Sequence, residues 1–495
     1  MRDGITLAAD ITLPAALPAP AVVMRTPYGR SGRVQEQRGD EMAAGGYAQL
    51  TVDVRGRGDS DGTFVPYRND GPDGVDVIAW VAAQPWCTGD VATYGGSYPG
   101  MIQYLTALHR PAALRAMVVM VTPSDPFVEE GTGVPSPMNV SWFRLVDGRA
   151  PQYVDGVDWM EVYRHRPLLT MDEAAGFVSA NWREELRHRT LDAFWEPRRY
   201  QHRIGEIDVP VLHVSGWYDD EEIGTPLNYA AMVGAGRTGQ HLLVGPWGHR
   251  VNATRTLGDV DFGPDALIDL NAHVLRFLDH HLRSGPPPGP TPVRLFVMGA
   301  NRWIDEEEWP PASTRETVLF LHGEGRANSR YGDGTLSAEP PGEEPADRWV
   351  HDPGSPVPFV TAPSSAQIGG PDDCAGIQGR SDVLVYSGAP LAGTWSPRSG
   401  GCSPRTRSGT ARAGPRASSS GRGRPRIPEP GPQGLAASGV PAAPAGGRAA
   451  SQAQTPIRAA AMASPSTHTP VHPHPAYTPP AAAEPAAPPT KYEVM

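Results

Sequence analysis

The chain of 495 residues is poor in cysteine and has no long apolar run. Its three cysteines show no Cys-x-x-Cys spacing, which excludes a disulfide framework and a cysteine-ligated zinc site. No stretch approaches the roughly 18 consecutive apolar residues of a membrane span, and the first twenty residues contain no unbroken apolar segment typical of a secretory leader. We therefore expect a soluble, cytoplasmic protein with no membrane partner.

Positive charge is also in short supply. The chain has 43 basic and 54 acidic residues, for a net charge of −11, and Lys491 is its one lysine. Sequence-independent binding to nucleic acid needs a basic face that neutralises phosphates. We therefore expect no nucleic-acid partner.

The charged residues, prolines and glycines are unevenly distributed. Residues 394–495 contain 11 basic and three acidic residues, with 19 prolines, 11 glycines and no phenylalanine, whereas residues 1–393 contain 32 basic and 51 acidic residues. A segment of the first kind buries too little apolar surface to offset the entropy lost on ordering. We predict a disordered Pro/Ala/Arg/Gly-rich tail over 394–495, although a basic interaction arm is an alternative.

Within residues 1–393, short apolar segments alternate with amphipathic ones. Strands are expected at residues 21–24, 48–54, 91–94, 114–121, 209–214 and 241–244, and helices between residues 72 and 85, over 99–108, from 226 and over 266–282. Strands that alternate with helices predict an α/β fold with a mostly parallel, doubly wound sheet.

Two interruptions of this alternation divide the chain. A helical, tryptophan-rich stretch over 125–205 predicts an inserted cap, so that the α/β core comprises residues 1–124 and 206–290. After 290 the helical pattern stops, and strand-like segments at 293–298 and 317–321 lie among dense turn signals. We therefore predict a second, β-rich domain over 291–393.

A serine lies in a glycine-rich turn between an expected strand and an expected helix. The segment reads Tyr94-Gly95-Gly96-Ser97-Tyr98-Pro99-Gly100. A nucleophile elbow needs this context, because the serine hydroxyl must project above the sheet from a sharp turn with small neighbours. The motif is Gly-x-Ser-x-x-Gly rather than the strict Gly-x-Ser-x-Gly, so that an ordinary glycine-rich turn remains an equal alternative for this segment alone.

An acid and a histidine follow in the order that α/β-hydrolases use. A serine becomes a strong nucleophile when a histidine takes its proton, and a carboxylate fixes the tautomer of that histidine. Asp219 and His249 each come shortly after an expected buried strand, where open α/β sheets place their sites. We predict Ser97 as the nucleophile, Asp219 as the orienting acid and His249 as the general base.

Further short motifs lie before and around these residues. They are Arg2-Asp3-Gly4, Arg25-Thr26-Pro27-Tyr28, Asp53-Val54-Arg55-Gly56-Arg57-Gly58-Asp59-Ser60, Gln84-Pro85-Trp86-Cys87, Gly216-Trp217-Tyr218-Asp219 and Pro246-Trp247-Gly248-His249. Together they resemble the cocaine-esterase and X-Pro dipeptidyl-peptidase family of α/β-hydrolases, the CocE/NonD hydrolases. The resemblance implies an α/β-hydrolase fold with a helical cap and a C-terminal jelly-roll-like β-sandwich. It also implies an oxyanion hole made by the Tyr28 hydroxyl and the Tyr98 backbone N–H, with no metal or cofactor.

The acids after Asp219 suggest a choice of substrate. In the α-amino acid ester hydrolase branch of this family, acids at the positions of Glu221 and Glu222 bind the substrate's ammonium group. The simpler interpretation, which we favour, is that these acids begin a helix, where they suit the helix dipole. Trp217, in the same motif, is a further candidate for substrate binding.

The resemblance ends near residue 392, in the middle of the expected sandwich, where the charge also changes sign. We therefore expect an incomplete β-sandwich, and a change of reading frame near Gly393 would explain it. The predicted function is hydrolysis of a small-molecule ester or amide by a Ser-Asp-His triad through an acyl-enzyme. The alternatives are an α-amino acid ester hydrolase or dipeptidyl-peptidase, and a truncated, catalytically silent family member.

Overall fold

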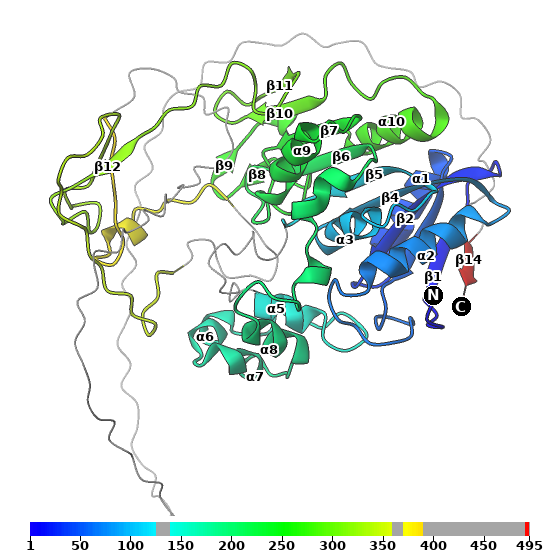
Figure 1. The fold of residues 1–495 in the computed structure, drawn as a ribbon, viewed down its shortest axis with the longest axis horizontal. Coiled ribbons are helices and arrows are strands. Elements are labelled where there is room, and N and C mark those ends of the chain that lie inside the picture. The colour runs from blue at the N-terminus through cyan, green and yellow to red at the C-terminus, as the bar shows by residue number, and fades with distance from the viewer. Residues whose placement is uncertain (125–138, 359–369, 390–490, 495) are drawn as a thin grey trace, which may run out of the picture. The chain divides into compact units, whose positions relative to one another are not determined.

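A ten-stranded sheet dominates the computed structural model, which describes residues 1–124, 139–358, 370–389 and 491–494 (Figure 1). Its strand order is β11-β10-β7-β6-β5-β4-β2-β3-β1-β14. The strands from β3 to β10 in this order run parallel, and β1, β11 and β14 pair antiparallel at the edges. The bounds are β1 (Ala9–Thr12), β2 (Ala19–Thr26), β3 (Ala48–Asp53), β4 (Cys87–Gly96), β5 (Leu114–Met120), β6 (Val211–Gly216), β7 (Gln240–Gly245), β10 (Val293–Val297), β11 (Arg302–Glu306) and β14 (Lys491–Val494).

Helices cover both faces of this sheet. They are α1 (Arg33–Ala44), α2 (Asp70–Ala82), α3 (Tyr98–Ala107), α9 (Gly224–Gly234) and α10 (Leu270–Arg283). Successive strand residues point to opposite faces; thus Val23 packs with α2, α3 and Met232 of α9, whereas Val22 packs with Met42 of α1 and with α10. This is the α/β class with a mostly parallel, doubly wound sheet that the sequence predicts.

The region between β5 and β6 contains short helices that gather in a cluster of their own (Figure 1). They are α5 (Asn139–Leu145), α6 (Trp159–Arg164), α7 (Met171–Ala174) and α8 (Ala180–Arg187), with single turns at η1 (Leu168–Thr170), η2 (Glu196–Arg198) and η3 (Gln201–Glu206). Phe143, Trp159 and the fully buried Trp182 form a hydrophobic core within this cluster. The predicted cap is therefore helical over its described part, and residues 125–138 lie outside the described residues.

The first strands after the predicted domain boundary at 290 belong to the main sheet. β10 pairs parallel with β7, and β11 pairs antiparallel with β10. The sequence predicts a second, β-rich domain from residue 291, and strand periodicity does not tell which sheet a strand joins, so the pairing with β7 was not apparent from the sequence. Beyond β11 the described part holds the small sheet of β12 (Phe320–His322) and β13 (Thr335–Ser337) and the turn η5 (Ile377–Gly379).

Most of the predicted tail lies outside the described residues, and so does the change of character near Gly393. The exception is β14, which pairs antiparallel with β1 in the register Ala9↔Val494 to Thr12↔Lys491. These last residues were predicted as part of the disordered tail, so for them the prediction differs from the structure. None of the helices in the described ranges has the length and apolar character that crossing a membrane requires.

Candidate active site

Ser97 lies in a strained turn between β4 and α3. Its backbone has φ 59° and ψ −130°, in a region that residues with a side chain rarely adopt. The turn is fixed from both sides, because the Ser97 N–H donates to the carbonyls of Met120 (2.9 Å) and Val121 (3.0 Å) at the end of β5, and the Ser97 carbonyl accepts from Gly100 and Met101 in α3. Ser97 therefore lies in a strained turn between a strand and a helix, which is the backbone geometry that a nucleophile elbow requires.

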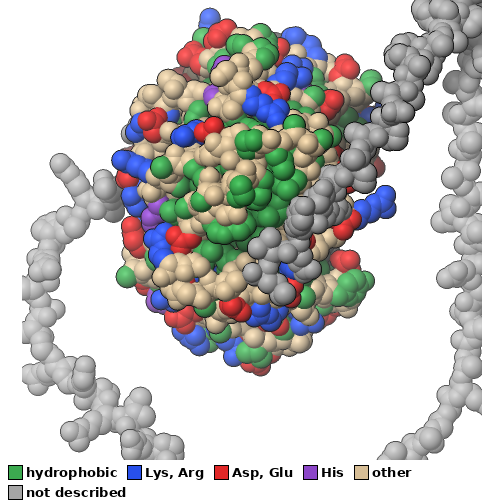
Figure 2. All heavy atoms as spheres, turned by 90° about the vertical axis from the view of Figure 1, so that its right-hand side faces the viewer, with side chains coloured by type: hydrophobic (Ala, Val, Ile, Leu, Met, Phe, Trp, Pro, Cys, Tyr) green, Lys and Arg blue, Asp and Glu red, His purple; other side chains and the backbone are tan. Residues whose placement is uncertain are grey.

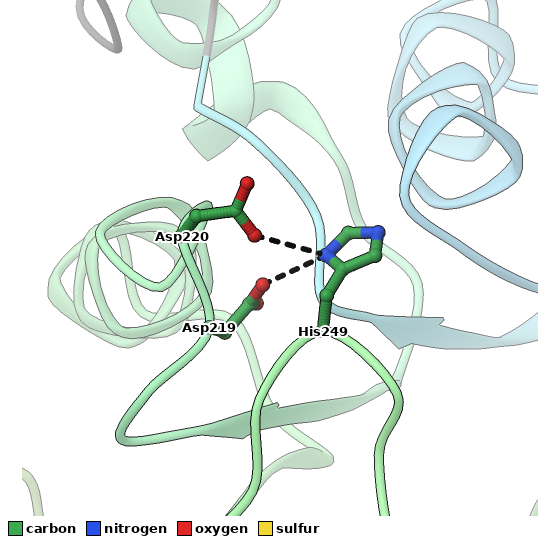
Figure 3. Close-up of side chains that lie close together, drawn as sticks. All are labelled: Asp219, Asp220 and His249. Atoms are coloured by element: carbon green, nitrogen blue, oxygen red, sulfur yellow. Dashed lines mark hydrogen bonds and ion pairs between the residues drawn. The ribbon is translucent and has the colours of Figure 1, made fainter. Parts of the chain in front are cut away.

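Asp219 and His249 form a hydrogen-bonded pair at the ends of β6 and β7 (Figure 3). Asp219 Oδ1 lies 2.8 Å from His249 Nδ1, and Asp219 Oδ2 accepts a hydrogen bond from the Ser215 hydroxyl at 2.8 Å. The Asp219 side chain is fully buried. A buried carboxylate that makes two hydrogen bonds holds the imidazole in the tautomer that leaves Nε2 available to accept a proton.

A second carboxylate faces the same ring nitrogen. Asp220 Oδ1 lies 3.6 Å from His249 Nδ1, and Figure 3 shows the other ring nitrogen pointing away from both carboxylates. Burial disfavours the charged imidazolium, but the hydrogen bond to Asp219 and the charges of Glu221, Asp219 and Asp220 outweigh it and raise the pKa of His249 to about 9. In this free state the imidazole is therefore mostly protonated at neutral pH.

Ser97 and His249 follow strands of the same parallel sheet, and Tyr28 and Glu221 connect their surroundings. The Tyr28 hydroxyl interacts with Ser97, and the charge of Glu221 acts on both Tyr28 and His249. Among the hydrogen bonds of the described residues, none joins the Ser97 hydroxyl to the imidazole. Catalytic hydrogen bonds are often long or poorly aligned without substrate, so a triad does not require this bond in the free protein.

Tyr28 follows β2, the neighbour of β4, and this register brings it beside Ser97. The Trp142 Nε1–H of the cap donates to the Tyr28 hydroxyl oxygen at 2.9 Å. Because an indole only donates, the phenol proton of Tyr28 is left for donation to another oxygen. Burial raises the pKa of Tyr28 to about 12, so the hydroxyl keeps its proton at any ordinary pH.

Tyr98 is the first residue of α3, and the first N–H groups of a helix have no acceptor within it. Its ring is locked in place: the hydroxyl donates to buried Asp70 at 2.7 Å, and the ring stacks on Tyr67 with centroids 4.5 Å apart. Tyr98 directly follows Ser97 in the chain, and the Tyr28 hydroxyl interacts with Ser97, so both are neighbours of the serine.

Of the predicted substrate-binding residues, Glu221 interacts with groups of the site, and the described contacts of Trp217 are made with β10 and Trp309. The charge of Glu221 raises the pKa of Tyr28, Tyr67 and His249, so its carboxylate lies near all three. Glu221 and Glu222 precede α9, which begins at Gly224, and their carbonyls accept from Gly224 and Thr225.

Trp217 instead has a packing role. Its indole donates to the Phe296 carbonyl of β10 at 2.7 Å, and its ring packs near Trp309. These contacts differ from the substrate contact that the motif suggested. The Phe296 carbonyl that fixes this ring lies 79 residues further along the chain, so the motif did not reveal this contact.

Asp219, Asp220 and His249 also form a group whose ligand atoms lie within 4.8 Å of one another, the single such group in the part of the chain that the structure describes. His249 Nδ1 and Asp219 Oδ1 are already bonded to each other. A metal ion would have to break the bond that orients the imidazole, so the group fits an ion pair better than a ligand set.

The structure adds site residues that sequence reasoning missed. The Ser215 hydroxyl donates a hydrogen bond to Asp219, and the Asp220 carboxylate faces His249. The Trp142 indole donates a hydrogen bond to Tyr28. The ring of Tyr67, whose backbone is left-handed (φ 64°), stacks on Tyr98. Asp220 was visible as the neighbour of Asp219. Trp142 lies 114 residues from Tyr28, and no local pattern connects them.

A serine at a strained strand–helix turn, with a histidine–carboxylate pair at the same edge of a mostly parallel sheet, is the arrangement of a serine hydrolase with the α/β-hydrolase fold. Comparison with known proteins agrees. The family model described as X-Pro dipeptidyl-peptidase (S15 family) matches residues 3–251, and that of the X-Pro dipeptidyl-peptidase C-terminal non-catalytic domain matches residues 289–396. The chain belongs to this X-Pro dipeptidyl-peptidase and cocaine-esterase family.

Individual relatives cover most of the chain. A cocaine esterase of Rhodococcus sp. is 31% identical over 419 residues, which span 78% of this chain and 72% of the relative. Two solved structures, an aminopeptidase of a Thaumarchaeota archaeon and an α-amino acid ester hydrolase, each align with a TM-score of 0.66 at 26% and 25% identity, over 79% of this chain and 71% of theirs. The predicted family and the prediction of an enzyme are confirmed.

Proposed function

We propose that this hydrolase cleaves an ester or amide bond through an acyl-enzyme formed on Ser97, with His249 as the general base and Asp219 as the acid that orients it. The observation that carries the proposal is the 2.8 Å bond between His249 Nδ1 and fully buried Asp219. Ser97, in its strained turn, supplies the nucleophile for that base. The Tyr28 hydroxyl and the Tyr98 N–H supply the oxyanion hole.

The proposed reaction proceeds in two halves. His249 Nε2 takes the Ser97 proton as the serine oxygen forms a bond to the substrate's carbonyl carbon, and the carbonyl electron pair moves onto its oxygen. Tyr28 and Tyr98 donate hydrogen bonds to that oxyanion. The tetrahedral intermediate collapses, the leaving group takes the proton from His249, and water repeats the sequence to release the acid and restore the serine.

A fluorophosphonate probe tests this proposal, because it labels only a serine that a working base activates. We expect labelling of the full chain, and its loss in Ser97→Ala and in His249→Ala. Ser60→Ala is the matched control, since this serine is also buried but its hydroxyl donates to the Asp53 carbonyl; Ser97 should still label in that variant. A folded full chain that stays unlabelled would contradict the proposal.

A second candidate function is hydrolysis of α-amino acid esters or of dipeptidyl substrates, with Glu221 binding the substrate's ammonium. It is favoured by the position of the Glu221 charge, which acts on Tyr28, Tyr67 and His249 together. A carboxylate in a partly desolvated site attracts a cation strongly. We propose this as a narrower form of the same function, with Glu222 as the second acid.

The test compares two esters that differ by an amino group. With Glu221→Gln, KM for an α-aminoacyl ester should rise by roughly tenfold, as loss of one charge-assisted contact predicts, while KM for the matching plain acyl ester stays within about twofold. Equal changes for both esters would argue against ammonium recognition and would leave the triad untouched.

A further inference from the structure

Arg57 is a fully buried arginine in the turn after β3. It stands between Gly56 and Gly58, which have φ values of +74° and +51°. A Cβ at Gly58 would lie 1.9 Å from Asp53 Oδ2, and a Cβ at Gly56 would lie 2.2 Å from the Phe64 backbone nitrogen. The two glycines therefore allow a tight turn that directs the arginine into the molecule.

The described hydrogen bonds of Arg57 all go to backbone carbonyls. Nε donates to Pro27 at 2.9 Å, and Nη1 donates to Val146 at 2.7 Å, to Asp147 at 3.3 Å and to Gly148. The last three carbonyls follow the end of α5, where the helix dipole favours a positive charge. One guanidinium thus joins the strand end that carries Tyr28 to the end of a cap helix.

These contacts link the backbone before Tyr28 to the helix that binds its hydroxyl. Pro27 is the residue before Tyr28, and α5 carries Trp142, whose indole donates to the Tyr28 hydroxyl at 2.9 Å. The backbone support and the hydroxyl support of Tyr28 therefore both depend on elements that Arg57 connects. A change at Arg57 would alter the distance between the phenol and the indole that orients it.

We propose that Arg57 is a positioning residue for the oxyanion hole, because it holds the Pro27–Tyr28 backbone and helix α5 at the spacing that directs the Tyr28 hydroxyl toward the reacting carbonyl oxygen. This rests on the proposed role of Tyr28. A buried charge is costly unless it is well bonded, and the planar fork of arginine reaches separate acceptors that a lysine ammonium cannot span at once.

The experiment measures hydrolysis of p-nitrophenyl butyrate by Arg57→Met, Tyr28→Phe and the double variant. Loss of one oxyanion-hole donor costs roughly 10²–10³-fold in kcat. We expect Tyr28→Phe to show a loss of that size and Arg57→Met to lower kcat by at least about tenfold, with KM changed by less than about threefold. In the Tyr28→Phe background, Arg57→Met should have little further effect, because the donor that it positions is gone.

Arg149→Met is the matched control. Arg149 also ties the cap to this turn, through the carbonyls of Gly58 (3.0 Å) and Ser60 (2.5 Å). No hydrogen bond between described residues joins its guanidinium to Pro27 or to the carbonyls of residues 146–148. The kcat of Arg149→Met should stay within about twofold of the kcat of the unmodified chain. Inhibition by phenylboronic acid, which forms a tetrahedral adduct on the serine, should weaken in Arg57→Met in parallel with kcat.

Two results would overturn the proposal: the same fold-loss for Arg57→Met in both backgrounds, or a change confined to KM. If circular dichroism shows that Arg57→Met does not fold, Arg57→Lys replaces it in the test. With Tyr28 present, Arg57→Lys should give a kcat between that of the unmodified chain and that of Tyr28→Phe. In the Tyr28→Phe background it should have no effect on kcat. Failure of the wider proposal would look different, since Ser97→Ala would then retain activity or Tyr28→Phe would equal the full chain.

Discussion

At the scale of single residues, the charge around His249 decides when the proposed base can work. A general base must be neutral to accept a proton, and the pKa of His249 is raised to about 9 by the hydrogen bond to Asp219 and the surrounding carboxylates, against the effect of burial. Below that pH most molecules carry the imidazolium. We therefore expect kcat/KM of the full chain to rise with pH, with its midpoint at about pH 9 and a plateau above it, which a pH–rate profile measures.

Asp220→Asn should move this profile. The substitution removes a negative charge 3.6 Å from His249 Nδ1 while Asp219 and Glu221 remain, so that the pKa of His249 falls and the rise in kcat/KM occurs at lower pH. Activity at pH 7 should increase by a few-fold up to about tenfold, since one pKa unit corresponds to a tenfold change in the neutral fraction.

Asp219→Asn is the comparison for that experiment. It removes the bond that sets the tautomer, and the equivalent change in a Ser-His-Asp protease lowers kcat by about 10⁴-fold. A profile of Asp220→Asn that coincides with that of the full chain would show that Asp220 does not influence the base.

The predictable part of the site is the part that follows strand ends. Ser97, Asp219 and His249 could be proposed because each comes just after a buried strand, and a parallel sheet collects such positions at one edge. Arg57 and Trp142 could not be assigned roles in this way. Their contacts between cap and core join residues that are 89 and 114 positions apart, and only the packing of the cap on the core creates them.

At the scale of secondary structure, close packing of α3 on β5 sets the position of Ser97. A Cβ at Gly100 would lie 2.1 Å from the Thr122 hydroxyl oxygen and 3.1 Å from the Met120 carbonyl oxygen. Met120 is also the residue whose carbonyl accepts the Ser97 N–H. The helix that begins at the nucleophile can therefore approach the strand only because glycine occupies this position.

Gly100→Ala should lower both stability and activity. Overpacking of this kind costs roughly 1–3 kcal/mol in the free energy of unfolding, which urea denaturation followed by tryptophan fluorescence would measure, and kcat should fall because α3 and Ser97 shift together. Gly234→Ala is the matched control in α9, where a Cβ would meet nothing within 4 Å. That variant should gain roughly 0.4–1 kcal/mol. Equal effects from the two substitutions would refute the packing argument.

The elements that could be predicted are those with a strong apolar pattern. β5 is buried along nearly its whole length, and α2 and α10 show clear apolar faces. By contrast, α1 was missed because its buried residues are only Gly39 and Met42 and most of the others are polar. β1 was missed because four residues near a sheet edge carry little pattern. The assignment of β10 to the main sheet likewise depends on pairing with β7, which the sequence alone does not reveal.

At the scale of the whole molecule, an edge of the main sheet lies beside an apolar hollow. A cavity of about 220 Å³ is lined mainly by apolar side chains close to β1, which are Met1, Ile5, Leu7, Ala9, Leu50, Val52, Val77 and Trp80, together with Thr6. Figure 2 shows hydrophobic side chains gathered on the face at the side of β1 and β14 in Figure 1. An exposed sheet edge next to apolar surface is a template for pairing with another chain.

Deletion of residues 491–495 should therefore promote self-association. β14 covers the outer side of β1 over Ala9–Thr12, and without it the backbone N–H and C=O groups on that side lose their partners, while those facing β3 stay paired. In sedimentation velocity, the deletion variant should show a larger share of dimers and higher species than the full chain, with a share that grows with concentration. Its kcat per molecule should be unchanged, because β1 holds none of the proposed catalytic groups, and this separates association from unfolding. If the two chains sediment alike at every concentration, β14 does not protect the edge, and the short length of β1, four residues, is then enough to keep the chain from pairing there.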